Sequence, residues 1–328
     1  MNNSITDIPG ILVGHADDRS AGTGCTVILC EKGAVAGADV RGGAPGTRET
    51  DCLQPVNAVP MIHAVYLSGG SAFGLDGASG VVRYLESRGI GYDVGVGTVP
   101  IVPGAVLFDL TVGDPRGRPD PAMGEQACRN AGISVLQGNV GAGTGAAIGK
   151  AAGVSYMMKG GVGTASASAG ELHVGAIAAV NCYGDVRDPD TGEILAGAVN
   201  STRDGFADSV RLMSRGPRCL NPFTATSTTL AVVATNARLS KADASRVAIM
   251  AQDGLARAVV PAHTPFDGDT VFALSTGTVE ADLAVVGTLA AVAVSNAIVN
   301  AVRSAASAYG LPGHAEMQER SRAGRRGS

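Results

Sequence analysis

Two short polar segments in the last third of the chain carry residue types that could cleave an amide bond. The first is Ser227-Thr228-Thr229, where hydroxyl side chains open an almost wholly apolar strand predicted for Thr229–Thr235. The second is Asp267-Gly268-Asp269, which places two carboxylates on a turn before a strand predicted for Val271–Ser275. A hydroxyl becomes a nucleophile when an adjacent base takes its proton. If the two strand starts are neighbours, hydroxyls and carboxylates can share one site.

Both segments also have ordinary structural roles. Thr228 could satisfy a turn and Asp267 could cap the backbone, because Asp-Gly-Asp is common in turns and threonine is common in strands. Spacing alone favours these structural roles. A catalytic triad that uses histidine has only weak support, because the histidines are scattered along the chain and form no H-E-x-x-H pair. They are His15, His63, His173, His263 and His314. The sequence predicts no metal site.

The glycine-rich segment Val140–Lys150 resembles a phosphate-binding loop without matching one. That motif needs glycine where Thr144 stands and serine or threonine where Ala151 stands. The dinucleotide fingerprint also fails, because neither Ala146 nor Ile148 supplies its third glycine. We therefore expect no nucleotide cofactor.

Composition excludes several classes of protein. With 25 basic and 29 acidic residues the net charge is −4, which does not predict binding to nucleic acid or to anionic membranes. The 47 glycines and the absence of tryptophan predict a core of small residues with closely packed backbones. Six cysteines without a C-x-x-C pair, and a start without a signal-peptide pattern, indicate a cytoplasmic protein with reduced thiols. Polar residues interrupt the apolar segment Leu283–Val302, which favours a buried helix over a membrane span.

The remaining elements predict the fold class. A helix is expected over Ser71–Arg88, and another begins after Ser240, whose partner in a capping box is Asp243. Strands grouped apart from long helices predict an α+β layered sandwich in a single domain, 1–328, with a flexible tail at 312–328. The further predicted strands are Gly24–Cys30, Ala34–Val40, Val65–Ser68 and Leu172–Tyr183.

Long specific stretches of the chain resemble the family of D-aminopeptidases, β-aminopeptidases and nylon-oligomer hydrolases, often called the DmpA-like family. The similarity runs from about Ile5 to Leu311. It implies a four-layer αββα sandwich of the N-terminal-nucleophile-hydrolase type, in which a precursor cleaves itself. The stretches that carry the resemblance are Gly22–Val27, Arg41–Glu49, Leu67–Asp76 and His263–Asp269.

The resemblance also implies roles for individual residues. The family's nucleophile matches Thr228, so the α chain would be 1–227 and the β chain 228–328, and the new α-amino group of Thr228 would act as the base. The lysine after the glycine-rich stretch matches Lys150, which would help to activate the hydroxyl. The asparagine at a strand end matches Asn181, which would stabilise the oxyanion.

The acidic pair of the nylon-hydrolase branch matches Asp267 and Asp269, which would orient the Thr228 amine. Aminopeptidase members tend instead to have a serine nucleophile, with serine and glutamate at the paired positions. The chain therefore lies nearer to the nylon-hydrolase branch. One departure is Ser227, which stands where the family usually has asparagine or glycine.

We therefore predict a self-processing amide hydrolase that acts on small linear amides, nearest to the 6-aminohexanoate-oligomer endohydrolases. The alternatives are an aminopeptidase, a β-peptidyl aminopeptidase or a D-amino acid esterase or amidase, and an acyltransferase that uses the same threonine. A non-catalytic scaffold is disfavoured because Thr228, Lys150 and both aspartates are present. The expected partners are a small amide substrate and further copies of the chain, assembled as a homotetramer of α/β pairs.

Overall fold

The computed structural model describes residues 2–216 and 227–327, with side chains to residue 324. Its main strands form one hydrogen-bonded path in the order β10-β11-β14-β16-β2-β4-β7-β3, with β1 beside β2. These strands are β1 Leu12–Asp18, β2 Thr23–Val40, β3 Thr47–Arg48, β4 Ile62–Ser68, β7 Gly104–Val106, β10 Gly161–Ala169, β11 Leu172–Asn181, β14 Thr228–Ala237 and β16 Thr270–Val279.

Six α-helices and several short strands complete the described part of the chain. The helices are α1 Ala78–Glu86, α2 Pro121–Arg129, α3 Ser209–Met213, α4 Lys241–Ala258, α5 Leu283–Ser304 and α6 His314–Gly327. The short strands are β5 Tyr92–Asp93, β6 Thr98–Val99, β8 Ala147–Ile148, β9 Met158–Lys159, β12 Asp185–Arg187, β13 Ile194–Ala196 and β15 Val259–Val260.

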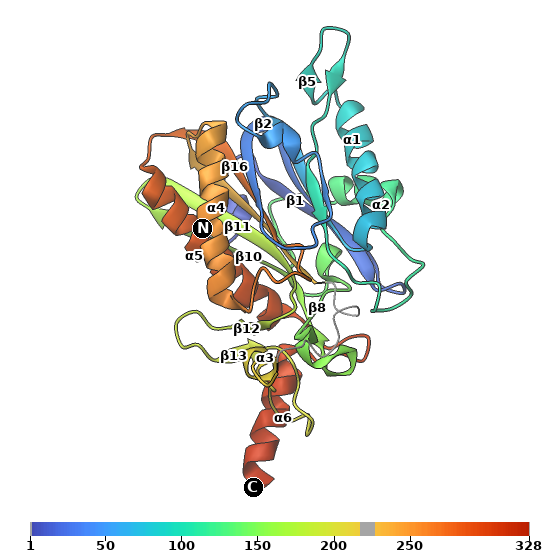
Figure 1. Ribbon diagram of the computed structural model, residues 1–328. Helices are drawn as coiled ribbons and strands as arrows, with labels where there is room; N and C mark the ends of the chain where they lie inside the picture. The colour runs from blue at the N-terminus through green and yellow to red at the C-terminus, as the bar shows by residue number, and fades with distance from the viewer. Residues whose placement is uncertain (1, 217–226, 328) are drawn as a thin grey trace.

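The long strand β2 joins two halves of the sheet. Its first part pairs with β1 and β4, and its last part, from Val35 to Val40, pairs with β16. One apolar cluster contains residues from both halves, including Val65 of β4 and Val232 of β14, so the halves stack face to face. Helices α4 and α5 cover the outer face of one half, and α1 and α2 cover the other (Figure 1). The αββα sandwich predicted from the sequence is therefore confirmed.

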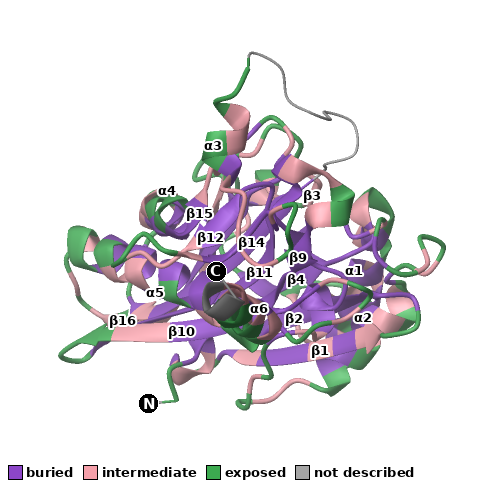
Figure 2. Ribbon diagram, turned by 90° about the horizontal axis from the view of Figure 1, so that it is seen from below, coloured by how far each residue is buried: buried purple, intermediate pink, exposed green. Residues whose placement is uncertain are grey.

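Alternation along β14 shows how the layers are built. Leu230, Val232 and Ala234 belong to the cluster between the sheet halves, whereas Ala231 and Val233 belong to the cluster beneath α4 and α5. Both faces of the strand are thus buried, which explains its unbroken apolar sequence. In Figure 2 the central strands form the buried interior of the molecule.

The two long helices follow the sequence closely. Helix α4 begins after Ser240, whose hydroxyl accepts a hydrogen bond from the Asp243 N–H at 3.2 Å, as the predicted capping box requires. Helix α5 is long and apolar enough to cross a membrane, but 67% of its most apolar window is buried in the protein. It packs against α4 and β10, as a core helix does.

Three expectations differ from the structure. The segments Gly24–Cys30 and Ala34–Val40 belong to one strand, β2, and not to two. The predicted helix at Ser71–Arg88 starts with a 3₁₀ segment, Ser71–Gly77, and only then becomes α1. Where a flexible tail was expected, α6 projects from the molecule (Figure 1), and its Met317 is buried at 1% exposure.

Candidate active site

The sheet brings the two polar segments together. Thr228 is the first residue of β14, and Ser227 directly before it forms a parallel bridge with Asp267. Because β14 and β16 run parallel, both strand starts lie at the same edge of the sheet. On the other side of β14 the antiparallel strand β11 ends at Asn181, which is paired with Thr228. Asp269, which precedes β16, accepts a hydrogen bond from the Thr229 N–H at 2.7 Å.

The Thr228 hydroxyl lies against the peptide bond that precedes it. Its Oγ1 donates to the Ser227 carbonyl oxygen at 2.5 Å, and the Gly268 N–H donates to the same oxygen at 2.8 Å. A backbone N–H so placed can stabilise negative charge that develops on that oxygen. A side chain at position 268 would place its Cβ 2.7 Å from Thr228 Oγ1, so the close approach requires glycine.

The neighbouring hydroxyls are placed differently. Within the residues that the structure describes, Ser227 Oγ and Thr229 Oγ1 are buried without a hydrogen-bond partner. Thr228 is itself buried, at 4% exposure. Of the three hydroxyls in this segment, Thr228 therefore has a hydrogen bond to the carbonyl at its own N-terminal side, which holds its oxygen beside the Ser227–Thr228 peptide group.

Protein donors surround both aspartates. Asp267 accepts hydrogen bonds from the Tyr183 N–H at 3.2 Å, from the Thr264 N–H at 3.0 Å and from the Thr264 hydroxyl. Burial, and then the nearby charge of Asp269, raise the pKa of the Asp267 carboxyl to about 6. Asp269 accepts from the Thr229 N–H and from the His263 N–H at 2.9 Å.

A glycine-rich segment holds the turn that carries these aspartates. The Ala44 N–H donates to the Asp267 carbonyl at 2.8 Å, and the Arg41 N–H donates to the Asp269 carbonyl at 2.9 Å. Between them, a Cβ at Gly42 would lie 2.2 Å from the Asp267 carbonyl oxygen. The stretch Arg41–Glu49 therefore owes its glycine at position 42 to close backbone packing beside the site.

Lys150 and Asn181 lie next to each other beside Thr228. Lys150 Nζ donates to the backbone carbonyl of Asn181 at 3.1 Å, and burial lowers the pKa of Lys150 to about 8. The Asn181 side chain accepts from the Ala147 N–H at 2.9 Å and donates to the Phe108 carbonyl at 3.0 Å. An asparagine amide has two N–H donors, so one of them is fixed by Phe108.

The sequence did not single out His263. Its Nδ1 lies 3.0 Å from Asp269 Oδ2, and its side chain is 22% exposed, so it borders the site from the solvent side. The signal was its position at the start of the stretch His263–Asp269. Among the described residues, no group of three or more His, Cys, Asp or Glu could hold a metal ion.

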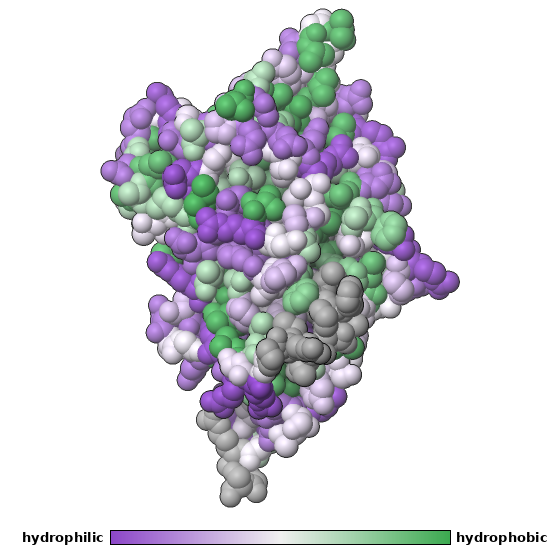
Figure 3. Space-filling view, viewed as in Figure 1, coloured by the Kyte–Doolittle hydropathy of each residue, from purple (hydrophilic) through white to green (hydrophobic). Residues whose placement is uncertain are grey.

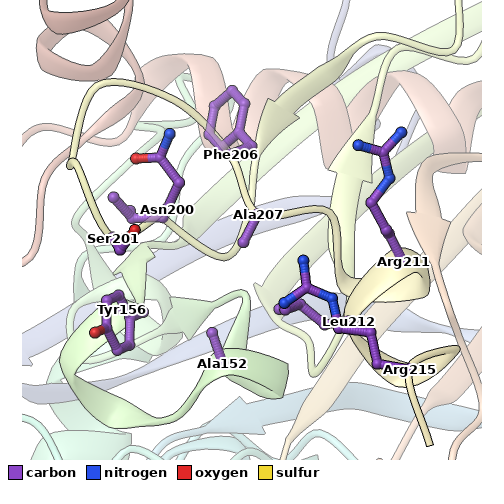
Figure 4. Close-up of a pocket in the computed structure, with 10 residues that line it drawn as sticks. Ala152, Tyr156, Asn200, Ser201, Phe206, Ala207, Arg211, Leu212 and Arg215 are labelled. Carbon is purple, nitrogen blue, oxygen red and sulfur yellow. The ribbon is translucent and has the colours of Figure 1, made fainter.

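A pocket of ≈ 390 Å³ lies beside helix α3, and its lining includes Ala152, which is close to Lys150 in the chain. Tyr156 and Phe206 line it opposite Arg211 and Arg215, as Figure 4 shows. Met213, on the same helix, packs instead against Tyr183 and Phe266, next to Asp267. Thr228 does not line this pocket.

Described cysteines match the expected buried thiols. Cys25, Cys30, Cys128 and Cys182 are free and buried, and Cys52 is partly exposed. Cys182 follows Asn181, and burial raises the pKa of its thiol well above the usual value. Cys219 lies outside the described residues.

The αββα sandwich that gathers this hydroxyl, lysine and carboxylate cluster at the start of a central strand is a fold shared with solved structures of known enzymes. The L-aminopeptidase D-Ala-esterase/amidase from Ochrobactrum anthropi, described as a variant of the N-terminal-nucleophile hydrolase fold, superimposes with a TM-score of 0.72 at 20% identity. The alignment covers 99% of this chain and 95% of that one. A β-aminopeptidase from Burkholderia sp. gives a TM-score of 0.68 at 22% identity, with 98% and 94% of the two chains covered.

The chain belongs to peptidase family S58, whose model matches residues 3–316. An uncharacterized aminopeptidase of Mycobacterium tuberculosis is 44% identical over 345 residues, covering 96% of this chain and 98% of the relative. A 6-aminohexanoate-oligomer endohydrolase of a Kocuria species is 30% identical over 287 residues, covering 84% and 75%. The protein is therefore a hydrolase of peptide-type bonds, and the predicted family is confirmed.

Proposed function

We propose that this protein is a self-processing amide hydrolase, which cleaves its own chain before Thr228 and then uses Thr228 as the nucleophile. The observation that carries the proposal is the hydrogen bond from Thr228 Oγ1 to the Ser227 carbonyl, whose oxygen also accepts from the Gly268 N–H. Nucleophile, scissile carbonyl and oxyanion donor are thus within contact of one another before any cleavage.

Self-cleavage would proceed through an ester. Thr228 Oγ1 attacks the Ser227 carbonyl carbon, the C–N bond breaks, and the nitrogen takes a proton to become the α-amino group of Thr228. Water then hydrolyses the ester between Ser227 and the Thr228 hydroxyl, which leaves a carboxylate on Ser227. The new α-amino group has an ordinary pKa of about 8, low enough to serve as the base of the hydroxyl near neutral pH.

The surrounding residues support the same chemistry on a substrate. Asp269 already accepts from the Thr229 N–H, so it lies beside the position of the new amine and can orient it. Lys150 adds positive potential under the strand start. The second N–H of Asn181 is the donor that would meet the oxyanion of a bound amide, an interaction worth about 3 kcal/mol in other hydrolases.

Small linear amides cut internally are the substrates that the site favours. An enzyme that removes terminal residues needs a charged group to hold the substrate's ammonium. Here both carboxylates already accept hydrogen bonds from protein donors, and both are 1% exposed. Oligomers of 6-aminohexanoate or similar amides are therefore our proposed substrates. The aminopeptidase named among the relatives is the competing activity.

Intact-mass spectrometry tests the proposal directly. Purified protein should give two fragments, 1–227 and 228–328, and the fragment pair should hydrolyse linear amides. The Thr228→Ala protein should remain one chain and show no hydrolysis. Wild-type protein that stays full-length and yet hydrolyses amides well would disprove the N-terminal mechanism.

A further inference from the structure

A second lysine, Lys159, is buried without an acidic partner. It ends strand β9 and is 0% exposed. Its Nζ donates to three backbone carbonyls, those of Gly143 at 2.8 Å, Ala146 at 2.8 Å and Gly160 at 3.0 Å. Within the described residues no carboxylate forms an ion pair with it. An ammonium group has three donors and no acceptor, so the three carbonyls match its protonated form.

Keeping a charge in this place is costly. Burial lowers the pKa of Lys159 to about 7, and the more distant charge of Asp109 only partly opposes this. An apolar side chain of similar length would avoid the desolvation. The three carbonyls would then lose their donor, and the Gly143–Ala147 turn would lose the group that joins its two ends to Gly160.

One peptide group links Lys159 to the candidate active site. The carbonyl of Ala146 accepts from Lys159 Nζ, and the N–H of the same planar peptide, on Ala147, donates to Asn181 Oδ1 at 2.9 Å. A charged donor on the carbonyl polarises the N–H at the other end of the peptide, which strengthens its hydrogen bond. Lys159 thus fixes both the orientation and the strength of the contact that holds the Asn181 side chain.

Lys150 follows this turn closely in the chain. The Gly149 N–H donates to the Gly184 carbonyl at 3.1 Å, and the Lys150 N–H donates to the Tyr183 carbonyl at 3.0 Å. Because only Ile148 and Gly149 separate Ala147 from Lys150, a shift of the turn would also strain these two hydrogen bonds that place Lys150.

We propose that Lys159 is a positioning residue of this hydrolase, whose ammonium group locks the 143–147 turn so that Asn181 and Lys150 face the nucleophile correctly. The inference rests on the proposed function, because it assigns Lys159 a part in that reaction. Lys159 itself contacts neither the nucleophile nor the aspartates in the described structure. It acts through the Ala146–Ala147 peptide.

Lys241 provides a matched control. Its Nζ also donates to three carbonyls, those of Cys52 at 2.9 Å, Asn57 at 2.8 Å and Val59 at 3.0 Å. It begins helix α4, which follows the end of β14, whereas Thr228 begins that strand. Loss of its ammonium group should loosen a loop at the opposite end of the strand.

The experiment compares Lys159→Met, Lys159→Gln and Lys241→Met in the full chain. We measure the rate of self-cleavage, kcat and KM on a linear amide, and the thermal midpoint. Lys159→Met should lower kcat at least tenfold, because small displacements of catalytic groups are costly, with KM changed less than about threefold. Lys159→Gln, which keeps two N–H donors, should lie between. Lys241→Met should keep kcat within about twofold at an equal loss of thermal stability.

Hydrogen exchange of the uncut Thr228→Ala chain gives a direct structural measurement. Adding Lys159→Met should speed exchange in 143–150 and not in 52–59, and adding Lys241→Met should do the reverse.

Two outcomes would overturn the inference. One is a Lys159→Met protein with kcat within twofold of wild type, and the other is an equal loss of kcat in Lys159→Met and Lys241→Met at an equal loss of thermal stability. If Lys159→Met does not fold, the Gln variant decides by the same criteria. Wild-type protein that neither cleaves itself nor hydrolyses amides would instead refute the proposed function, and the exchange measurement would still show whether Lys159 holds the turn.

Discussion

At the scale of single residues, two ionisable groups of the candidate site lie where burial opposes their ordinary charge. Asp267 and Lys150 are both buried, and burial raises the pKa of the acid and lowers that of the base. Their values, about 6 and about 8, bracket neutral pH. In the mechanism that we propose, such a pair could respond to the proton that the new α-amino group of Thr228 would gain and lose.

The choice of hydroxyl can be tested by substitution. Thr228→Ser keeps the nucleophilic oxygen and loses only the methyl group that restricts its rotamer, so cleavage should continue more slowly. Ser227→Ala should still be cut at the same bond, because its Oγ makes no hydrogen bond within the described residues. Sequencing the smaller fragment checks both, and it should begin Thr-Thr-Leu-Ala-Val, or Ser-Thr-Leu-Ala-Val in the serine variant. Processing of Thr228→Ala would show that Ser227 or Thr229 is the nucleophile.

The raised pKa of Asp267 predicts a specific dependence of stability on pH. Between pH 3.8, the ordinary pKa of an aspartate, and about pH 6, the folded protein binds the proton that the unfolded chain releases. Stability therefore falls as pH rises through this window, by at most about 3 kcal/mol from this group. In the uncut Thr228→Ala chain, adding Asp267→Asn should remove that fall. The free energy of unfolding of both proteins in urea, measured at pH 4 and pH 6.5, checks this. If the difference between the two proteins is the same at both pH values, the raised pKa does not belong to Asp267.

At the scale of elements, a strand–helix–strand unit explains why the site forms. β14, α4 and β16 follow one another, and β14 and β16 pair in parallel, which requires a crossover such as α4. The sequence pattern predicted these three elements. Because parallel neighbours start at the same edge, it could also place Thr228 near Asp267 and Asp269.

Other parts of the site had no such signal. Asn181 meets Thr228 only because β11 pairs with β14 in one particular antiparallel register, and strand pairing between distant segments leaves no local pattern. The continuity of β2 was hidden by Glu31-Lys32-Gly33, where a charged pair and a glycine at φ +87° resemble a turn. The Gly268 N–H, which we propose as an oxyanion donor, is a backbone group, and a search for reactive side chains does not reveal it.

Two helix glycines test how closely the layers pack. A Cβ at Gly254 of α4 would lie 2.1 Å from the Ala291 carbonyl of α5, which is rigid backbone. A Cβ at Gly287 of α5 would meet the Met250 side chain at 2.2 Å, and that side chain can move. Gly254→Ala should therefore cost about 1–3 kcal/mol of stability, whereas Gly287→Ala should cost little because alanine favours helix. Unfolding in denaturant gives the free energy of unfolding of both variants. An equal loss of stability in the two would show that backbone contact at Gly254 does not limit the packing of α4 against α5.

At the scale of the whole molecule, the two proposed fragments are interleaved. β14 and β16 of 228–328 lie between β11 and β2 of 1–227, with hydrogen bonds on both sides. Cleavage before Thr228 would break one peptide bond and no strand pairing within β14. The two chains should therefore remain one folded domain.

Assembly of several copies is a further prediction. Apolar side chains gather on the β5–β6 hairpin at the top of Figure 3, and Val94 and Val96 there are 48% and 98% exposed. We expect a homotetramer of α/β pairs, in keeping with closed symmetric assembly in most oligomers. Light scattering should give a mass well above the 32.7 kDa of one chain. A monomer mass at all concentrations would rule this out.

The last prediction decides between internal and terminal cleavage. If the site holds no carboxylate available to a substrate ammonium, blocking that ammonium should have little effect. We therefore expect an N-acetylated linear amide and its free-amine form to have kcat/KM values within about fivefold, which corresponds to about 1 kcal/mol. An aminopeptidase that pairs its substrate's ammonium with a buried carboxylate would lose far more, because truncating such a pair costs about 2–5 kcal/mol.

His263→Gln is a useful companion variant, since it removes a ring beside Asp269 Oδ2 and leaves the backbone N–H donor in place. If loss of the ring contact creates a dependence on the free amine, the contact between His263 and Asp269 contributes to internal cleavage. Strict dependence on the free amine in the wild-type protein would place it instead among the aminopeptidases.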